Sequence, residues 1–355
     1  MVDIRTSIKD LLIEADLLNA SDIHIGTNTP PILRINNDLK PLAMEPLSYD
    51  ETKILLYQLM TPVQQEILLK EKLVDFAIGY EGIGRFRVHI YYQRGNLVGA
   101  IRKLAGKIPE LDELGLPSAV AKLAEMKMGL VLVTGPTGSG KSTTLASIID
   151  AINENTRQNI ITIEDPLEYI HISKKSLINQ QELYSDFYSF ADALKGALRA
   201  DPDVILVGEM RDLDTIRTAI TAAETGHLVF STLHTRDATS ALTRIIGAFS
   251  PEEQMQIKLQ LSVSLKAVIS QQLLPRADEP GRVLATEVLI VNPAISNLIR
   301  LGKQEQIYMA IETGTKIGMQ TMEQSLADLY KQGKISYEIA VRSAKSLSLI
   351  EERIK

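Results

Sequence analysis

Hydrophobic positions in the first hundred residues switch repeatedly between helical and strand spacing. Six of them recur three or four residues apart and predict a helix over 3–18: Ile4, Ile8, Leu11, Leu12, Ala15 and Leu18. Short apolar runs predict strands at 23–25, 32–35, 74–78, 85–92 and 97–102, with a turn at 36–38. Capping-box sequences that begin at Ser48 and at Thr61 predict two helices within about 49–71. We therefore expect an N-terminal α+β domain over 1–103.

The pattern changes after a polar stretch at 104–116, which is rich in glycine and proline and predicts a linker. From residue 117, helical segments alternate with fully apolar runs at 130–133, 159–163, 204–207 and 227–230. Such runs are typical of parallel strands buried on both faces. A capping box at Ser250 then predicts helices from about 250 to the end, with one strand at 283–290. The predicted fold is thus α/β, with a RecA-like or doubly wound second domain over 117–355.

Composition narrows the possible functions. The 355 residues carry a formal charge of -6, with 23% charged and 45% hydrophobic residues, as ordinary globular proteins do. No apolar run approaches the roughly 18 residues of a membrane-spanning helix, and the N-terminus lacks the apolar core of a secretory signal. The chain contains no cysteine, which excludes disulfides, thiolate zinc sites and iron-sulfur clusters. We expect a cytoplasmic protein, and its acidic balance argues against a nucleic-acid partner.

A phosphate-binding motif is the strongest chemical signal. It lies between an apolar run and a predicted helix that extends to about residue 153, and it comprises Gly135, Pro136, Thr137, Gly138, Ser139, Gly140, Lys141 and Ser142. We also assign Thr143 to this nucleotide site. Glycines let backbone N–H groups turn toward phosphates, Lys141 reaches the β and γ oxygens, and the Ser142 hydroxyl can ligate Mg²⁺. A simple tight turn would explain neither the lysine nor the hydroxyl, so we predict ATP and Mg²⁺ as cofactors.

Two glutamates follow other predicted strands of the same domain. Glu164 follows the run at 159–163, and Glu209 comes two residues after the run at 204–207. Ligands bind at the carboxyl ends of such strands. We predict that Glu209 holds the Mg²⁺ hydration shell or the attacking water, and that Glu164 orients this water or accepts its proton. The alternative for either residue is a solvated surface position.

Histidine is scarce, with five in the chain, and two flank one predicted strand. His234 follows the strand and could hydrogen-bond a γ-phosphate, whereas His227 begins it and is expected at the opposite end. An ordinary structural role remains open for both residues.

Arginines in the first domain offer a further contact with phosphate. Arg85, Arg87 and Arg102 lie in predicted strands. A guanidinium can clamp a γ-phosphate across a domain or subunit interface. Ion-paired arginines on a sheet face are the alternative, and sequence spacing does not decide between the two.

These motifs together resemble one family. The segments 21–25, 84–88, 134–144, 163–168, 207–212 and 221–235 are similar to secretion ATPases of type II secretion and type IV pili, especially to PilT-type retraction ATPases. The resemblance covers about 4–345. It implies a PAS-like first domain, a RecA-like second domain and a homo-hexamer. Glu164 would belong to the aspartate box, Glu209 to an atypical Walker B motif, and His227 and His234 to the histidine box.

The resemblance also implies a cellular role. The hexamer would work at the inner face of the plasma membrane with a membrane-embedded platform protein and the pilus machinery, and Arg87 and Arg102 would complete its nucleotide sites. Assembly motors usually carry an extra N-terminal domain and a tetracysteine zinc module, which are not seen here. One departure is Ser296, where retraction motors commonly have arginine. An assembly motor, a P-loop kinase and a nucleic-acid translocase remain as alternative functions.

Overall fold

The computed structural model describes residues 7–36, 38–104 and 106–355, which form two compact units. Among these described residues, the first unit takes in the chain up to Lys107 together with Asp165–Ile170 and Glu182–Tyr188, and the second comprises Ile108–Glu164, His171–Gln181 and Ser189–Lys355. The change at Lys107 falls inside the stretch 104–116. Each unit has its own buried cluster of apolar side chains.

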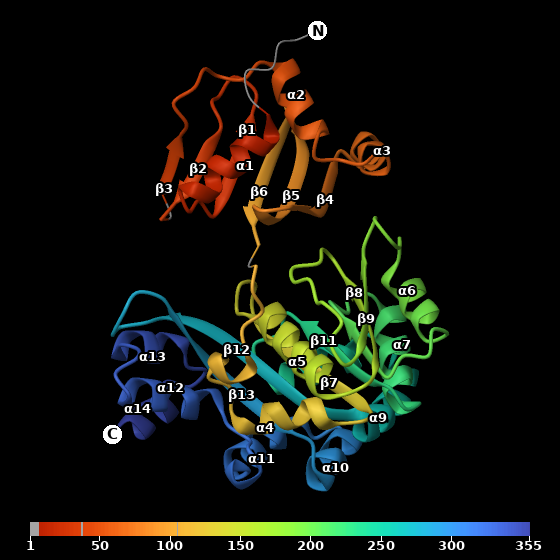
Figure 1. The fold of residues 1–355 in the computed structure, drawn as a ribbon. Helices are drawn as coiled ribbons and strands as arrows, with labels where there is room; N and C mark the ends of the chain where they lie inside the picture. Colours follow the sequence, from red (N-terminus) through yellow and green to blue (C-terminus); the bar gives the residue numbers. More distant parts are fainter. Residues whose placement is uncertain (1–6, 37, 105) are drawn as a thin grey trace. The chain divides into compact units, whose positions relative to one another are not determined.

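An antiparallel sheet with three helices builds the first unit (Figure 1). Within the described residues the strand order is β3-β2-β1-β6-β5-β4. The strands are β1 (Asp22–Gly26), β2 (Ile32–Ile35), β3 (Asp38–Pro41), β4 (Leu73–Tyr80), β5 (Gly84–Gln93) and β6 (Asn96–Lys103). The helices are α1 (Ile8–Leu17), α2 (Tyr49–Tyr57) and α3 (Pro62–Glu71). The predicted α+β character is confirmed, although Ile4 and Asn37 lie outside the described residues.

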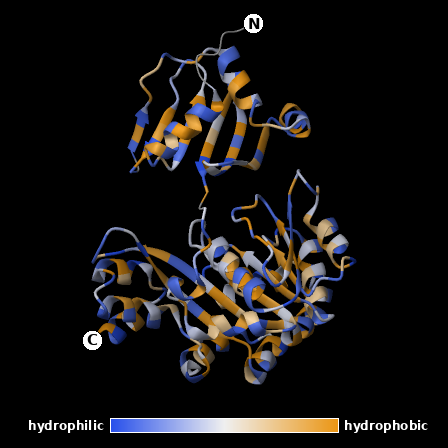
Figure 2. Ribbon diagram, in the orientation of Figure 1, coloured by the Kyte–Doolittle hydropathy of each residue, from blue (hydrophilic) through white to orange (hydrophobic). Residues whose placement is uncertain are grey.

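Local sequence explains these elements. Both capping boxes predicted for the first unit form, since Ser48 and Thr61 accept hydrogen bonds from the N–H groups of Glu51 and Gln64. Burial alternates along β5, where every second side chain enters the core. Figure 2 shows the resulting mixture of hydrophobic and hydrophilic residues along these strands.

A buried carboxylate joins two later stretches of the chain to the first unit. Glu182 is 5% exposed and accepts hydrogen bonds from the N–H groups of Ala77 (3.0 Å) and Leu167 (3.1 Å). Arg85 donates to the carbonyl of Leu167 at 3.2 Å and lies 3.7 Å from the Glu182 carboxylate. Burial raises the pKa of Glu182, so these donors offset the cost of enclosing its charge.

A mixed sheet forms the centre of the second unit. Among the described residues its order is β13-β12-β7-β11-β10-β8-β9. The strands are β7 (Gly129–Thr134), β8 (Asn159–Glu164), β9 (Leu177–Glu182), β10 (Val204–Val207), β11 (Leu228–Leu233), β12 (Leu265–Pro275) and β13 (Arg282–Ile290). The pairs β12–β7, β7–β11, β11–β10 and β10–β8 are parallel, and β13 is antiparallel to β12. The predicted α/β fold is confirmed.

Helices cover this sheet and continue to the C-terminus. They are α4 (Ser118–Ala121), α5 (Lys141–Asn155), α6 (Phe190–Ala197), α7 (Leu213–Glu224), α8 (Ala238–Gly247), α9 (Pro251–Ser264), α10 (Pro293–Leu301), α11 (Ile307–Thr313), α12 (Met322–Lys331), α13 (Tyr337–Ser343) and α14 (Leu347–Ile354). The last three pack around a separate apolar cluster that includes Leu326, Ala340 and Ile350. No helix in the described part of the chain is long and apolar enough to cross a membrane.

The region after residue 250 differs from the prediction. Helices with one strand were expected there, but α9 runs directly into β12, which pairs with both β7 and β13. Figure 1 shows β12 and β13 as a long pair of strands beside β7. The helix prediction was wrong for 265–275 because no turn residue separates the helix from the strand. β3 and β9 were also missed.

The Ser296 departure has a local contact in the structure. Its hydroxyl, on α10, donates a hydrogen bond to the carbonyl of Ser262 near the end of α9. Ser296 therefore joins the two helices directly.

Candidate nucleotide site

The phosphate-binding motif forms a glycine-rich loop between β7 and α5. All six residues of β7 are buried, and Gly135, Gly138 and Gly140 have φ values of 146°, 78° and 90°. A Cβ atom at Gly135 would lie 2.5 Å from both the Gln271 carbonyl oxygen and the Ser139 hydroxyl oxygen. Only glycine fits this position without displacing the neighbouring backbone.

Lys141 lies across the loop. Its ammonium donates hydrogen bonds to the carbonyl oxygens of Gly135 at 2.9 Å and Pro136 at 3.0 Å. Ser142 and Thr143 follow in the first turn of α5, whose N-terminal N–H groups favour an anion. The arrangement presents a cation, a hydroxyl and backbone donors at one end of a helix, which suits a polyphosphate.

The strand register brings the predicted carboxylates to the same edge of the sheet. Val207 pairs with Ile163, so Glu164, the last residue of β8, and Glu209, two residues after β10, lie at the carboxyl ends of neighbouring strands. The Gly208 N–H donates to the Ile163 carbonyl at 2.8 Å, and Gln180 donates to the Glu164 carboxylate at 3.5 Å.

His234 meets one of these carboxylates. Its Nε2 lies 3.3 Å from Oε1 of Glu209, whose other oxygen lies 2.8 Å from Nε of Arg211. The N–H of Gly135, the first loop residue, donates to the carbonyl of Leu233 at 3.3 Å. The end of β11 thus touches both the loop and Glu209. His227 lies at the opposite end of β11, with its Nδ1 3.0 Å from the Ala222 carbonyl oxygen.

The predicted arginines lie in the first unit, each with an acidic partner. Arg87 donates twice to Asp75, at 3.1 Å each, and Arg102 donates to Asp22 at 2.8 Å. The Arg102 side chain is nevertheless 68% exposed, so its guanidinium remains accessible.

Polar residues that the sequence did not single out support the site. Gln271 of β12 donates to the Thr144 hydroxyl in α5 at 2.7 Å, and the Thr232 hydroxyl of β11 donates to the Gly208 carbonyl at 2.5 Å. Both lie in strands that pair with β7 or β10, so recognising them required the strand order.

The donor set suits magnesium held mainly by a substrate. Mg²⁺ prefers oxygen ligands and commonly takes one or two protein groups, several waters and phosphate oxygens. The Ser142 hydroxyl and the Glu209 carboxylate are donors of this kind. Clusters of three or more histidine or acidic residues that could hold a metal are absent from the described residues.

Comparisons with known proteins place this chain in a family. The family described as "Type II/IV secretion system protein" matches residues 3–342. The type IV pilus retraction ATPase PilT of Pseudomonas aeruginosa is 44% identical over 338 residues, which cover 95% of this chain and 98% of that protein. The chain belongs to the type IV pilus retraction ATPases. The prediction made from the motifs is confirmed.

Further similarity extends along the whole retraction ATPase. A twitching motility protein of Neisseria gonorrhoeae is 48% identical over 316 residues, 89% of this chain and 84% of that protein. A crystal structure of the pilus retraction motor PilT with bound ADP has a TM-score of 0.91 and 48% identity, and covers 98% of this chain and 100% of that chain. The likeness therefore includes both units.

Proposed function

We propose that this chain hydrolyses ATP, with Mg²⁺, to power the retraction of type IV pili. The observation that carries the proposal is the meeting of the phosphate-binding loop, Glu209 and His234 at one edge of the sheet. The similarity of the chain to retraction ATPases over nearly their whole length supports the direction of the work.

Each residue has a chemical task in this proposal. Lys141 and the loop N–H groups would bind the phosphates, and the Ser142 hydroxyl would be a ligand for Mg²⁺, which would supply positive charge to neutralise the phosphate oxygens. Glu209 would hold the water molecules around the metal, or the attacking water. Glu164, held by Gln180, orients this water or accepts its proton, and His234 contacts the γ-phosphate from the end of β11.

The assembly belongs to the same proposal. We expect a homo-hexamer in the cytoplasm, at the inner face of the plasma membrane, that acts on a platform protein of the pilus machinery. Arg87 and Arg102 would complete a nucleotide site in the ring. An arginine that stabilises the transition-state charge can be supplied by a second polypeptide chain.

Mixed rings test whether Arg102 acts on another subunit. Separately, Arg102→Ala and Lys141→Ala subunits should hydrolyse little ATP. If the two kinds of subunit exchange randomly in a one-to-one mixture, about a quarter of the subunit interfaces will join an intact phosphate-binding loop to an intact Arg102. We expect ATP turnover to recover accordingly in a phosphate-release assay. No recovery, despite subunit exchange shown by native mass spectrometry, would contradict an action in trans.

Counting pili tests the direction of the motor. In a bacterium whose own retraction ATPase is replaced by this chain, Glu209→Gln should increase surface pili several-fold and abolish twitching, because assembly continues without retraction. The matched control is Glu125→Gln, at an exposed position outside the site. Bald cells would instead indicate an assembly motor, and unchanged pili would contradict a role in pilus dynamics.

A further inference from the structure

The loop between α13 and α14, residues 344–346, is held by a buried carboxylate. Glu323 of α12 is 1% exposed, and its Oε1 accepts hydrogen bonds from the N–H groups of Lys345 (3.0 Å) and Ser346 (3.3 Å). Its other oxygen accepts a hydrogen bond from the Tyr308 hydroxyl at 2.9 Å. The backbone at Lys345 is therefore fixed by contacts that do not involve its own side chain.

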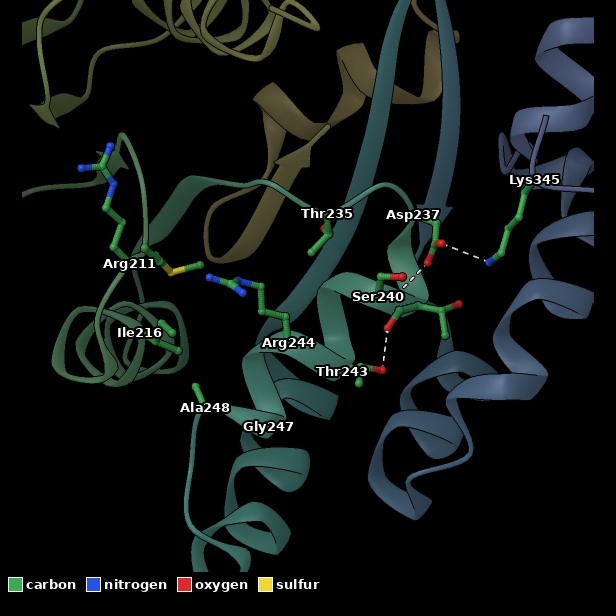
Figure 3. A pocket seen from close by; sticks show the side chains of 12 residues that line it. Arg211, Ile216, Thr235, Asp237, Ser240, Thr243, Arg244, Gly247, Ala248 and Lys345 are labelled. Atoms are coloured by element: carbon green, nitrogen blue, oxygen red, sulfur yellow. Dashed lines mark hydrogen bonds and ion pairs between the residues drawn. The ribbon is translucent and has the colours of Figure 1, made fainter. Parts of the chain in front are cut away.

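The Lys345 side chain reaches out of this loop to the segment after β11. Its ammonium lies 3.0 Å from Oδ2 of Asp237 and 5.8 Å from the centre of the Tyr308 ring. Figure 3 shows Lys345 extending from the C-terminal region toward Asp237, and both residues line a cavity of about 660 Å³. The Asp237 side chain is 13% exposed, so the partner of the lysine is largely withdrawn from water.

Asp237 in turn fixes the start of α8. Its Oδ1 accepts a hydrogen bond from the Ser240 N–H at 2.7 Å, which caps the helix. Next to it, the N–H of Ala238 donates to the buried Glu287 of β13 at 2.8 Å. Only two residues separate Asp237 from His234, so the cap defines where the short segment after β11 ends.

We propose that Lys345 is a positioning residue for ATP hydrolysis. Through Asp237, it fixes the segment 234–237 and so keeps His234 beside Glu209. This inference rests on the proposed function of the site, and it adds that the C-terminal helices take part in forming that site.

The charges around the Lys345–Asp237 ion pair explain why a positive charge is needed at residue 345. Asp237, Glu287 and Glu323 are acidic, and all three contact this part of the network, while Lys345 supplies a positive charge among them. An exposed ion pair contributes little, because water competes and the side chains lose freedom. Here the Lys345 side chain is 56% exposed, but the Asp237 side chain is only 13% exposed. The lysine is also pre-positioned by the hydrogen-bonded loop backbone and by the Tyr308 ring, so less side-chain freedom is lost when the pair forms.

The test compares Lys345→Met with Lys331→Met, a matched change at an exposed lysine of α12. We expect kcat for ATP to fall about ten-fold in Lys345→Met, with KM within two-fold of wild type, because the phosphate-binding loop is untouched. Lys345→Arg should restore most of the activity. The inference is overturned if kcat in Lys345→Met stays within two-fold of the Lys331→Met value, or if the loss simply follows a lowered melting temperature that Arg does not restore.

A double-mutant cycle tests the route through Asp237. Asp237→Asn keeps a capping oxygen for Ser240 but removes the charge that Lys345 contacts. The kcat of the double variant, Asp237→Asn with Lys345→Met, should lie within two-fold of the kcat of the slower single variant. If the two single-variant losses in kcat instead multiply in the double variant, Lys345 does not act through Asp237. If purified wild type hydrolyses no ATP, the proposed function itself fails; if wild type is active and Lys345→Met equals its control, only the positioning role fails.

Discussion

Replacing Lys141 by alanine will lower kcat for ATP by at least about 100-fold, in line with the loss of a preorganised donor to transition-state charge. The variant should also lose most of its affinity for ATP, because the cation that spans the loop is removed. A ligand that binds only the native state raises the free energy of unfolding by about 2.7 kcal/mol when its concentration is a hundred times its Kd. The rise in melting temperature that ATP causes in wild type should therefore disappear.

Two measurements check this prediction, a coupled ATPase assay and thermal unfolding with and without ATP. Lys127→Ala is the matched control, since this lysine is exposed and lies before β7 in the same unit. Turnover and a nucleotide-induced shift like those of wild type would contradict the assignment of the loop.

Replacing Glu287 by glutamine should stabilise the chain at alkaline pH. Glu287 is 2% exposed, and burial raises its pKa from 4.5 to about 7, opposed by the hydrogen bond from Ala238 and increased by the charge of Asp237. Between pH 4.5 and 7 the folded chain keeps a proton that the unfolded chain has released. Stability is therefore lost as the pH rises through this window, and the loss is complete above about pH 7.

The expected size follows from the shift. A pKa raised from 4.5 to about 7 corresponds to roughly 3 kcal/mol. The free energy of unfolding of Glu287→Gln should exceed that of wild type by this amount at pH 8, but should not exceed it below pH 4.5. Urea unfolding followed by circular dichroism at several pH values measures it, since the chain has no tryptophan for fluorescence. Glu125→Gln is the exposed control. A stability difference for Glu287→Gln that is the same at pH 4.5 and pH 8 would contradict the titration.

Local signals explain most of what the sequence predicted. The loop at 135–142 was found because its chemistry is encoded in consecutive residues, and the capping boxes were found because each spans four positions. Glu209 and His234 were found because both follow buried strands, but their 3.3 Å contact depends on the neighbouring positions of β10 and β11. The sequence supplied candidates, and the sheet order brought them together.

Other features depend on contacts that no local pattern encodes. β12 was missed because the helix before it ends without a glycine or proline, and its Gln271 and Gln272 interrupt the apolar run. β9 is a mostly polar strand at the edge of the sheet. The network around Lys345 joins residues more than a hundred positions apart, such as Asp237 and Lys345.

The enclosed Glu182 carboxylate has a consequence for dividing the chain into fragments. The first unit is built from three separate segments of the chain, and Glu182 belongs to the last of them. A fragment that stops at Lys107 would leave the N–H of Ala77 without its acceptor. The complementary fragment would carry Glu182 without Arg85 or that N–H. Cutting the chain at a single point therefore cannot yield two self-sufficient halves.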